Sequence, residues 1–276
     1  MTIAITGSTG ALGGAVARRV ADLAPRLVVR DAGRAPTLED SHVVVASYGD
    51  EQASVRALEG VDVLLMVSGS ESADRREQHR TFVRAAATAG VSHVVYTSFA
   101  GASPDATFTL GRDHADTEEA VRTSGMAWTL LRDDFYAEVV PLFADAEGVI
   151  RGPAGSGRVA LVGRLDVADV AAAVLRDPAA HRDVAYDLTG PEAVTLDEAA
   201  RRAGAVLGRD LRYEEETVEE AYASRAAEYD VPQWQLDAWV STYTAIADGS
   251  VARVSGDVER VLGRPARTLE DALLGR

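Results

Sequence analysis

The chain opens with a β-branched run that is followed at once by three glycines at fixed spacing. The run Thr2–Thr6 reads as a strand, and Gly7, Gly10 and Gly13 form a G-x-x-G-x-x-G pattern that leads into an apolar helix. In such a unit the first glycine allows a tight turn, the second lets a pyrophosphate approach, and the third lets the helix pack on the strand. The N–H groups and dipole at the helix N-terminus favour phosphate. A glycine-lined structural turn is the alternative, but the position at the first strand–helix turn favours dinucleotide binding.

Short apolar runs alternate with longer alanine-rich segments through the first half of the chain. The predicted strands are Thr2–Thr6, Arg26–Val29, His42–Ala46, Val61–Val67, His93–Phe99 and Met126–Arg132. The predicted helices are Ala11–Ala24, a segment capped by Asp50 that ends before Gly60, Ser72–Gly90 and Arg112–Ser124. Alternating strands and helices build βαβ units and a parallel sheet. We therefore predict an α/β fold with a Rossmann-type doubly wound parallel sheet.

The alternation of strands and helices changes after Tyr136. The expected elements are a hairpin or paired short strands within Val149–Val162, a helix Asp166–Leu175 capped by Asp166, a strand Val184–Leu188, a helix Leu196–Leu207 and acidic helical segments over 214–250. We predict an NAD(P)-binding domain over residues 1–136. A smaller α+β substrate-binding or lid region over 137–276 is expected to pack on it as part of one compact unit.

Composition excludes several classes of function. The 276 residues carry 28 basic and 43 acidic side chains, and a net charge of −15 argues against nucleic acid or anionic membrane as a partner. There is no cysteine, the five histidines show no metal-ligand spacing, and every basic residue is an arginine. No apolar run reaches the roughly 18 residues of a membrane span, and no signal peptide is visible, so we expect a cytoplasmic protein. No feature of the sequence indicates an oligomeric state.

Several motifs extend beyond the glycine loop. Residues 6–13 read T-G-S-T-G-A-L-G, and further motifs lie at Val63–Ser70, Val94–Ala100, Arg112–Glu119, Leu130–Tyr136, Tyr186–Glu192 and Leu262–Pro265. Together they resemble the atypical short-chain dehydrogenase/reductases of the NmrA-like family, and within it the NmrA-like NAD(P)H:quinone oxidoreductases. The resemblance covers nearly the whole chain. It implies a nicotinamide cofactor and a small aromatic or quinone-like substrate.

The choice between NADP(H) and NAD(H) depends on the end of the second strand. An acidic residue there holds the ribose diol of NAD, whereas an arginine meets the 2′-phosphate of NADP. Arg30 stands at this place, and pairing with phosphate suits its guanidinium. Asp31 follows directly, and a shift of one residue would make it the selector. We favour NADP(H) over NAD(H). The cofactor-binding candidates are Gly7, Ser8, Thr9, Gly10, Ala11, Leu12, Gly13, Arg30, Ser68, Gly69, Thr97 and Ser98.

The proton donor of the standard short-chain dehydrogenases is absent. Those enzymes use a Tyr-x-x-x-Lys pair, but no tyrosine lies between Ser98 and Tyr136 and the chain has no lysine. A keto-reductase, an alcohol dehydrogenase and a nucleotide-sugar epimerase are therefore disfavoured. A quinone relaxes the requirement, since its reduced anion is far less basic than an alkoxide. The resemblance makes His114 the candidate catalytic residue, and its alternative is a helix-face histidine bonded to Glu118.

Three aromatic residues are candidates for the substrate site. Phe99, Phe135 and Tyr136 stand at the carboxyl ends of the fifth and sixth strands, where a flat ring would bind, and ordinary core packing is the alternative. Related proteins usually have L-R-N-G-W-Y-x-E-N here, whereas this chain has Asp133 and Asp134. An aromatic lining favours the enzyme. A polar or empty pocket would favour the rival function, a non-catalytic NADP(H)-binding redox sensor of NmrA type.

Overall fold

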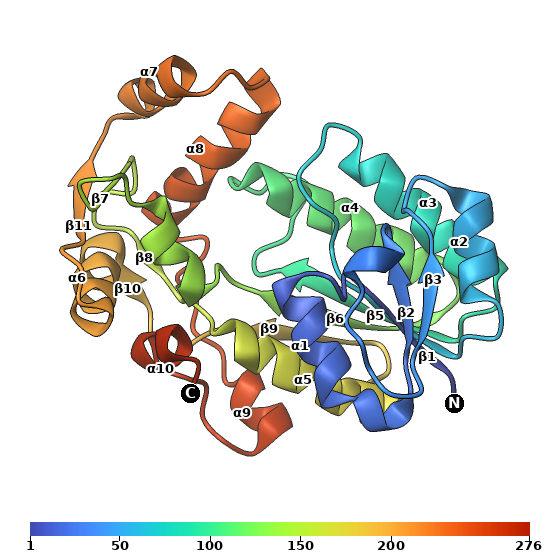
Figure 1. The fold of residues 1–276 in the computed structure, drawn as a ribbon. Helices are drawn as coiled ribbons and strands as arrows, with labels where there is room; N and C mark the ends of the chain where they lie inside the picture. The colour runs from blue at the N-terminus through green and yellow to red at the C-terminus, as the bar shows by residue number, and fades with distance from the viewer. The chain divides into compact units, whose positions relative to one another are not determined.

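A seven-stranded sheet forms the framework of the dinucleotide-type fold in the computed structural model, which describes residues 1–276 (Figure 1). Its strands lie in the order β3-β2-β1-β4-β5-β6-β9. They are β1 (Ile3–Thr6), β2 (Arg26–Val29), β3 (His42–Val45), β4 (Val63–Met66), β5 (His93–Phe99), β6 (Ala127–Asp133) and β9 (Val184–Leu188). The pairs β1–β2, β2–β3, β1–β4 and β4–β5 are parallel. The strand order reverses between β1 and β4, so the predicted doubly wound sheet is confirmed, and its ligand crevice belongs at the carboxyl ends of these two strands.

The helices that accompany this sheet follow the predicted pattern with shifted ends. They are α1 (Ala11–Arg19), α2 (Glu51–Leu58), α3 (Arg75–Thr88), α4 (Thr109–Thr123) and α5 (Arg164–Arg176), with short 3₁₀ turns η1 (Ala21–Leu23), η2 (Ala32–Arg34) and η4 (Pro178–His181). Asp50 caps α2 as predicted, because its Oδ1 accepts the Ala53 N–H at 2.9 Å. The helix predicted to reach Ala24 ends at Arg19, and η1 follows it.

Contacts within the chain divide it into two compact units, each assembled from separate segments. Unit 1 comprises Met1–Ser98, Asp113–Arg132 and Val167–Tyr186. Unit 2 comprises Phe99–Arg112, Asp133–Asp166 and Asp187–Arg276. The predicted division at Tyr136 into two consecutive regions stays a prediction.

The core of unit 1 lies between the sheet and its helices. All four residues of β4 are buried, as expected for a central parallel strand that is covered on both faces. Leu64 and Met66 of this strand share one cluster with Phe82 of α3 and with Val94 and Tyr96 of β5. This packing fixes the positions of the strand ends that form the ligand crevice.

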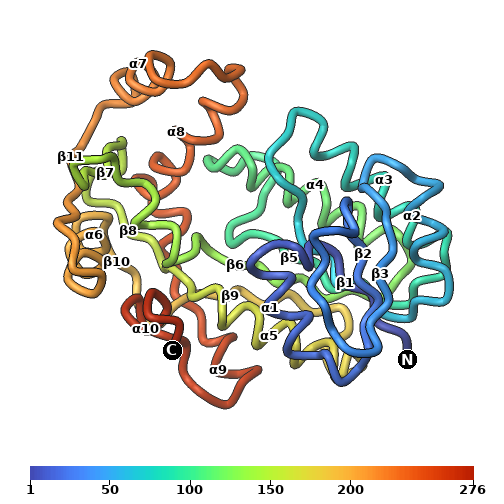
Figure 2. Tube along the Cα trace, viewed as in Figure 1, coloured from blue at the N-terminus to red at the C-terminus, as the bar shows by residue number.

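Unit 2 is built from short strands and helices. The segment Val149–Val162 contains two short strands, as one of the two predicted alternatives had it, but they do not pair with each other, so the hairpin alternative is wrong. Its elements are η3 (Ala137–Phe143), β7 (Val149–Gly152), β8 (Arg158–Val159), β10 (Val194–Thr195), α6 (Leu196–Leu207), β11 (Arg212–Glu215), α7 (Val218–Glu228), α8 (Gln233–Ala247), α9 (Asp257–Leu262) and α10 (Leu269–Leu274). The strand β7 pairs in parallel with β11, and β8 pairs antiparallel with β10 (Figure 2). Gly152 packs directly on the Tyr243 ring, and Gly157 packs on the Ile246 carbonyl, where a Cβ would clash.

Asp166 does not cap α5 as predicted. The helix begins at Arg164, so Asp166 lies in its first turn. Its buried carboxylate accepts the Arg267 N–H at 2.7 Å and pairs with the Arg264 guanidinium at 2.8 Å. A side chain that the sequence indicates as a local cap therefore holds a distant segment of the chain.

None of the helices of the chain is both long and apolar enough to cross a membrane.

Candidate functional site

The glycine loop of unit 1 is a tight turn against which α1 packs with no space for side chains. Gly7 has φ +65°, and its carbonyl accepts the Gly10 N–H at 2.9 Å. A Cβ on Gly7 would lie 2.9 Å from the Cβ of Val67. A Cβ on Gly13 would lie 2.4 Å from the Gly7 carbonyl oxygen, far inside van der Waals contact. The turn and the close approach expected from the glycine spacing are therefore both present.

The N-terminus of α1 is left open toward the loop. Gly10 occupies the N-cap position, and no side chain caps the helix, so the first-turn N–H groups have no partner within the helix. Ser8 is 3% exposed, and its Oγ has no hydrogen-bond partner. Free amide donors, the positive end of a helix dipole and an unpartnered buried hydroxyl together fit the phosphates of a dinucleotide.

A pocket in unit 1 joins the loop to the ends of four strands, β1 to β4. It is lined by Thr6, Gly7, Thr9, Val28, Val29, Arg30, Ala46, Tyr48, Val67, Ser68, Gly69 and Ser70. Five of the predicted cofactor-binding residues are brought together here, namely Gly7, Thr9, Arg30, Ser68 and Gly69. The pocket lies where the strand order reverses, which is the usual ligand position in open α/β sheets.

The two candidate selectors after β2 have different surroundings. Arg30 is exposed and lines the pocket. The Oδ1 of Asp31 instead accepts the Gly33 N–H at 2.9 Å and caps η2. The carboxylate is therefore engaged in its own turn, whereas the guanidinium remains at the pocket.

Tyr48 is a pocket residue that the sequence alone did not single out. Its hydroxyl donates to the Val67 carbonyl at 2.5 Å and bonds to Thr6 Oγ1 at 2.6 Å. Its ring stacks on Phe82 with centroids 4.2 Å apart, and burial raises the pKa of its phenol. The only signal in the sequence that could have indicated Tyr48 is its position just after the third strand. No motif distinguishes that position.

The loop after β4 is held from behind by two buried side chains of α3. The Gly69 N–H donates to His79 Nε2 at 2.9 Å, and Arg75 Nε donates to the Gly69 carbonyl at 3.0 Å. Since Nε2 accepts, the ring proton lies on Nδ1, which bonds to Thr117 Oγ1 at 2.8 Å. Burial, aided by Arg75, lowers the pKa of His79 to about 3, so the ring is neutral. His79 and Arg75 thus position a predicted cofactor-binding residue.

His114 lies in the same buried network. Arg75 Nη2 donates to its Nε2 at 3.1 Å, and its Nδ1 bonds to the Tyr96 hydroxyl at 2.9 Å. Burial first, and then the charge of Arg75, lower the pKa of His114 well below its ordinary value. The ring is therefore neutral at physiological pH, which disfavours a proton-donating imidazolium.

Glu118, which sequence suggested as the partner of His114, organises the end of β5 instead. Its carboxylate accepts from Ser98 Oγ at 2.6 Å and from Arg132 Nη2 at 2.6 Å. The neighbouring hydroxyl of Thr97 accepts the Ser68 N–H at 2.8 Å. Thr97 and Ser98 thus brace the strand ends around the pocket.

The predicted substrate residues lie in unit 2. Phe99 and Phe135 have ring centroids 4.9 Å apart, and Phe108 lies about equally close to both. Phe99 is 7% exposed and belongs to the core cluster, whereas Phe135 is partly exposed against it. The Tyr136 ring lies under the Arg164 guanidinium at 4.9 Å.

Two buried carboxyl groups lie at the carboxyl end of β6, on its last residue and on the residue that follows it. Asp133 accepts the hydroxyl proton of Tyr136, and burial raises the pKa of Asp133 to about 7. Asp134 is 2% exposed, and its Oδ2 has no hydrogen-bond partner. Burial, together with the adjacent Asp133, raises the pKa of Asp134 well above its usual range. Both groups stand where the sequence departs from the related motif.

Comparisons with known proteins show the family of this chain. Residues 7–178 match a family described as NAD(P)H-binding. A (4-alkanoyl-5-oxo-2,5-dihydrofuran-3-yl)methyl phosphate reductase of Streptomyces griseus subsp. griseus is 36% identical, with 98% of this chain and 95% of the relative covered. Quinone oxidoreductase 2 of Escherichia coli is 33% identical, with 98% and 97% covered. The crystal structure of the NADPH-dependent quinone oxidoreductase QOR2 of Escherichia coli with NADPH has a TM-score of 0.90 and 32% identity over 99% of both chains.

Proposed function

The chain belongs to the NAD(P)H-binding family and is an NmrA-like NAD(P)H oxidoreductase, and from this premise we propose that it transfers a hydride from NADPH to a quinone-like acceptor. The observation that carries the proposal is the pocket at the open N-terminus of α1, with Arg30 on its wall and no Tyr–Lys pair in the chain. The Escherichia coli relative found by both sequence and structure is described as a quinone oxidoreductase, which supports a quinone as acceptor.

Arg30 supports NADPH over NADH. Its guanidinium is exposed at the pocket, where it would meet the 2′-phosphate with charge-assisted hydrogen bonds. Asp31, the competing selector, has its Oδ1 engaged with the Gly33 N–H. The remaining phosphates would lie on the first-turn amides of α1 and beside the unpartnered Ser8 Oγ.

The chain's own residues bind and orient the two reactants, and bound NADPH supplies the hydride. Gly69 is fixed by Arg75 and His79, and this keeps the loop after β4 in place. His114 is neutral in its buried network, so we assign it the role of holding Arg75 and Tyr96 rather than that of an acid. The acceptor must then be one whose reduced form takes its proton from water or from a weak donor. A hydroquinone anion meets this condition, and an alkoxide does not.

The direct test is the oxidation of NADPH and NADH by a panel of acceptors. Benzoquinones and naphthoquinones should be reduced, whereas simple ketones should not react and secondary alcohols should not be oxidised by NADP⁺. His114→Ala tests whether His114 donates the proton to the reduced acceptor, because loss of a general acid would lower turnover by roughly 10²–10⁴-fold. We expect a smaller loss and no change in the shape of the pH profile. Tight NADPH binding without turnover on any quinone would instead favour the redox sensor.

A further inference from the structure

Unit 2 contains a cavity that the dinucleotide pocket does not use. It lies between α7, α8, β7 and the end of η3, and its volume is about 470 Å³. All the residues that line it belong to unit 2. A space of this size accommodates a small organic molecule, for which 300–1,000 Å³ is typical.

The walls of this cavity are rich in aromatic rings. Phe143, Tyr229, Trp239 and Tyr243 line it, in a chain with only 6% aromatic residues. The rings of Tyr229 and Trp239 meet edge to face, with centroids 5.3 Å apart, and those of Phe143 and Tyr243 are 6.0 Å apart. Such faces bind flat rings by stacking, and they also attract cations through their quadrupole.

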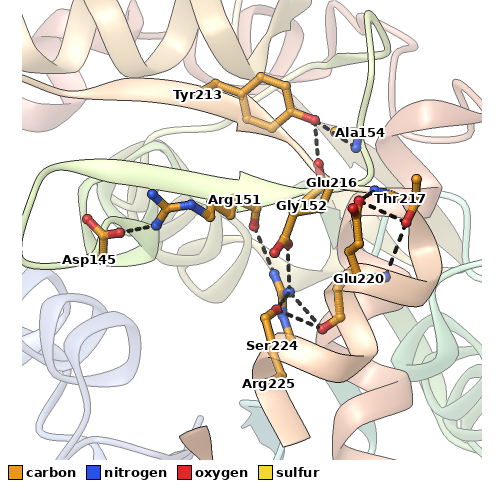
Figure 3. A network of polar contacts seen from close by, with 11 residues as sticks. Asp145, Arg151, Gly152, Ala154, Tyr213, Glu216, Thr217, Glu220, Ser224 and Arg225 are labelled. Atoms are coloured by element: carbon orange, nitrogen blue, oxygen red, sulfur yellow. Dashed lines mark hydrogen bonds and ion pairs between the residues drawn. The ribbon is translucent and has the colours of Figure 1, made fainter. Parts of the chain in front are cut away.

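The two arginines of the wall are already neutralised (Figure 3). Arg225 pairs with Glu216 at 3.1 Å and also donates to the Arg151 carbonyl at 2.8 Å. Arg151 pairs with both Asp145 and Glu214. Neither guanidinium is therefore available to an anionic ligand.

One carboxylate of the wall has no cationic partner. Glu228 lines the cavity at the end of α7, is exposed and takes part in no ion pair; its carboxylate accepts a hydrogen bond from the Tyr229 hydroxyl. With the arginines neutralised, the remaining charge on the wall is negative. The net charge of −15 on the whole chain adds to the attraction of a cation.

We propose that this cavity binds a planar aromatic cation, with the ring against Trp239 and Tyr229 and the positive charge toward the Glu228 carboxylate. The site goes beyond the proposed reductase function, since none of the residues that line it lines the dinucleotide pocket. An aromatic anion would meet Glu228 without a free arginine to compensate, so the site discriminates by charge.

The test is calorimetric titration of the full chain, without cofactor, with three probes of one size. These are N-methylquinolinium, neutral 1-methylnaphthalene and anionic 1-naphthoate. The cation should bind roughly three- to thirtyfold more tightly than the neutral probe, from a cation–π contact and an exposed charge pair. Glu228→Gln should lower cation affinity by up to about fivefold and spare the neutral probe. Trp239→Leu should weaken both.

Glu219→Gln is the matched control, because Glu219 lies on the same helix, is exposed and does not line the cavity. It should leave all three affinities unchanged. The proposal would be overturned if the three probes bound equally, if naphthoate bound more tightly, or if none of them bound. It would also be overturned if Glu228→Gln had no larger effect than the control. Because NADPH oxidation is measured separately, such a failure leaves the reductase assignment intact.

Discussion

Replacing Asp133 by asparagine is expected to stabilise the protein at alkaline pH and to change its stability little in acid. The carboxyl group is buried, and its pKa in the folded protein is raised from 3.8 to about 7. The folded state therefore binds more protons than the unfolded state between these two values, and stability is lost as pH rises through them. Asparagine has the same shape, keeps an oxygen to accept the Tyr136 proton, and carries no charge.

The size of the effect follows from the pKa difference. About three pH units at about 1.4 kcal/mol each give a penalty of about 4 kcal/mol for the ionised Asp133 above pH 7. The Arg164 guanidinium offsets part of the burial cost, and that offset is already contained in the raised pKa. The adjacent Asp134, whose pKa is also raised, would be relieved of a like charge. Asp133→Asn should therefore raise the free energy of unfolding by up to about 4 kcal/mol at about pH 8, and by almost nothing near pH 4.

Urea unfolding followed by circular dichroism, at several pH values between about 4 and 8, measures this difference. Asp22→Asn is the control, since that exposed carboxylate pairs with Arg176, which lowers its pKa and gives it the opposite pH dependence. Equal effects of Asp133→Asn at both ends of the pH range would refute a buried, raised carboxyl group. So would a variant that is destabilised throughout.

Three further predictions concern unit 1. Arg30→Ala should weaken NADPH binding roughly tenfold or more, the usual result of losing a charge-assisted hydrogen bond, and leave NADH nearly unchanged; equal losses in a binding titration would make Arg30 structural. Gly13→Ala would place a Cβ 2.4 Å from the Gly7 carbonyl oxygen, so it should lower stability by about 1–3 kcal/mol and weaken NADPH, whereas Gly256→Ala, with open space around it, should leave NADPH affinity and the melting temperature unchanged. His79→Leu should leave the Gly69 N–H unsatisfied and weaken NADPH. Because the pKa of His79 is lowered to about 3, its contribution to stability is present above about pH 6.5 and is lost as the pH falls toward 3. In thermal melts, His79→Leu should therefore make the melting temperature fall less steeply toward acid pH. An unchanged pH profile would contradict a buried neutral ring.

Elements whose signals are local could be predicted from the amino-acid order. The glycine spacing from Gly7 to Gly13 and the adjoining apolar run specify a strand, a turn and a helix, and the structure has all three. The strands β2 and β5 begin and end at the predicted residues, because their apolar runs are also local signals. Alternation of such elements is enough to imply a parallel sheet, since parallel strands need crossover helices.

Contacts between groups that are distant along the chain could not be predicted, because they form only when the chain packs. Strands as short as β7 and β8 carry no signal that specifies their partners. The sequence therefore predicted a hairpin or paired short strands, whereas β7 pairs with β11 and β8 with β10. Burial, aided by Arg75 of the same helix, lowers the pKa of His79. Its tautomer depends on Gly69 in the loop after β4 and on Thr117 of α4. Burial and hydrogen bonding are properties of neighbours in space, and these neighbours are brought together only when the chain packs.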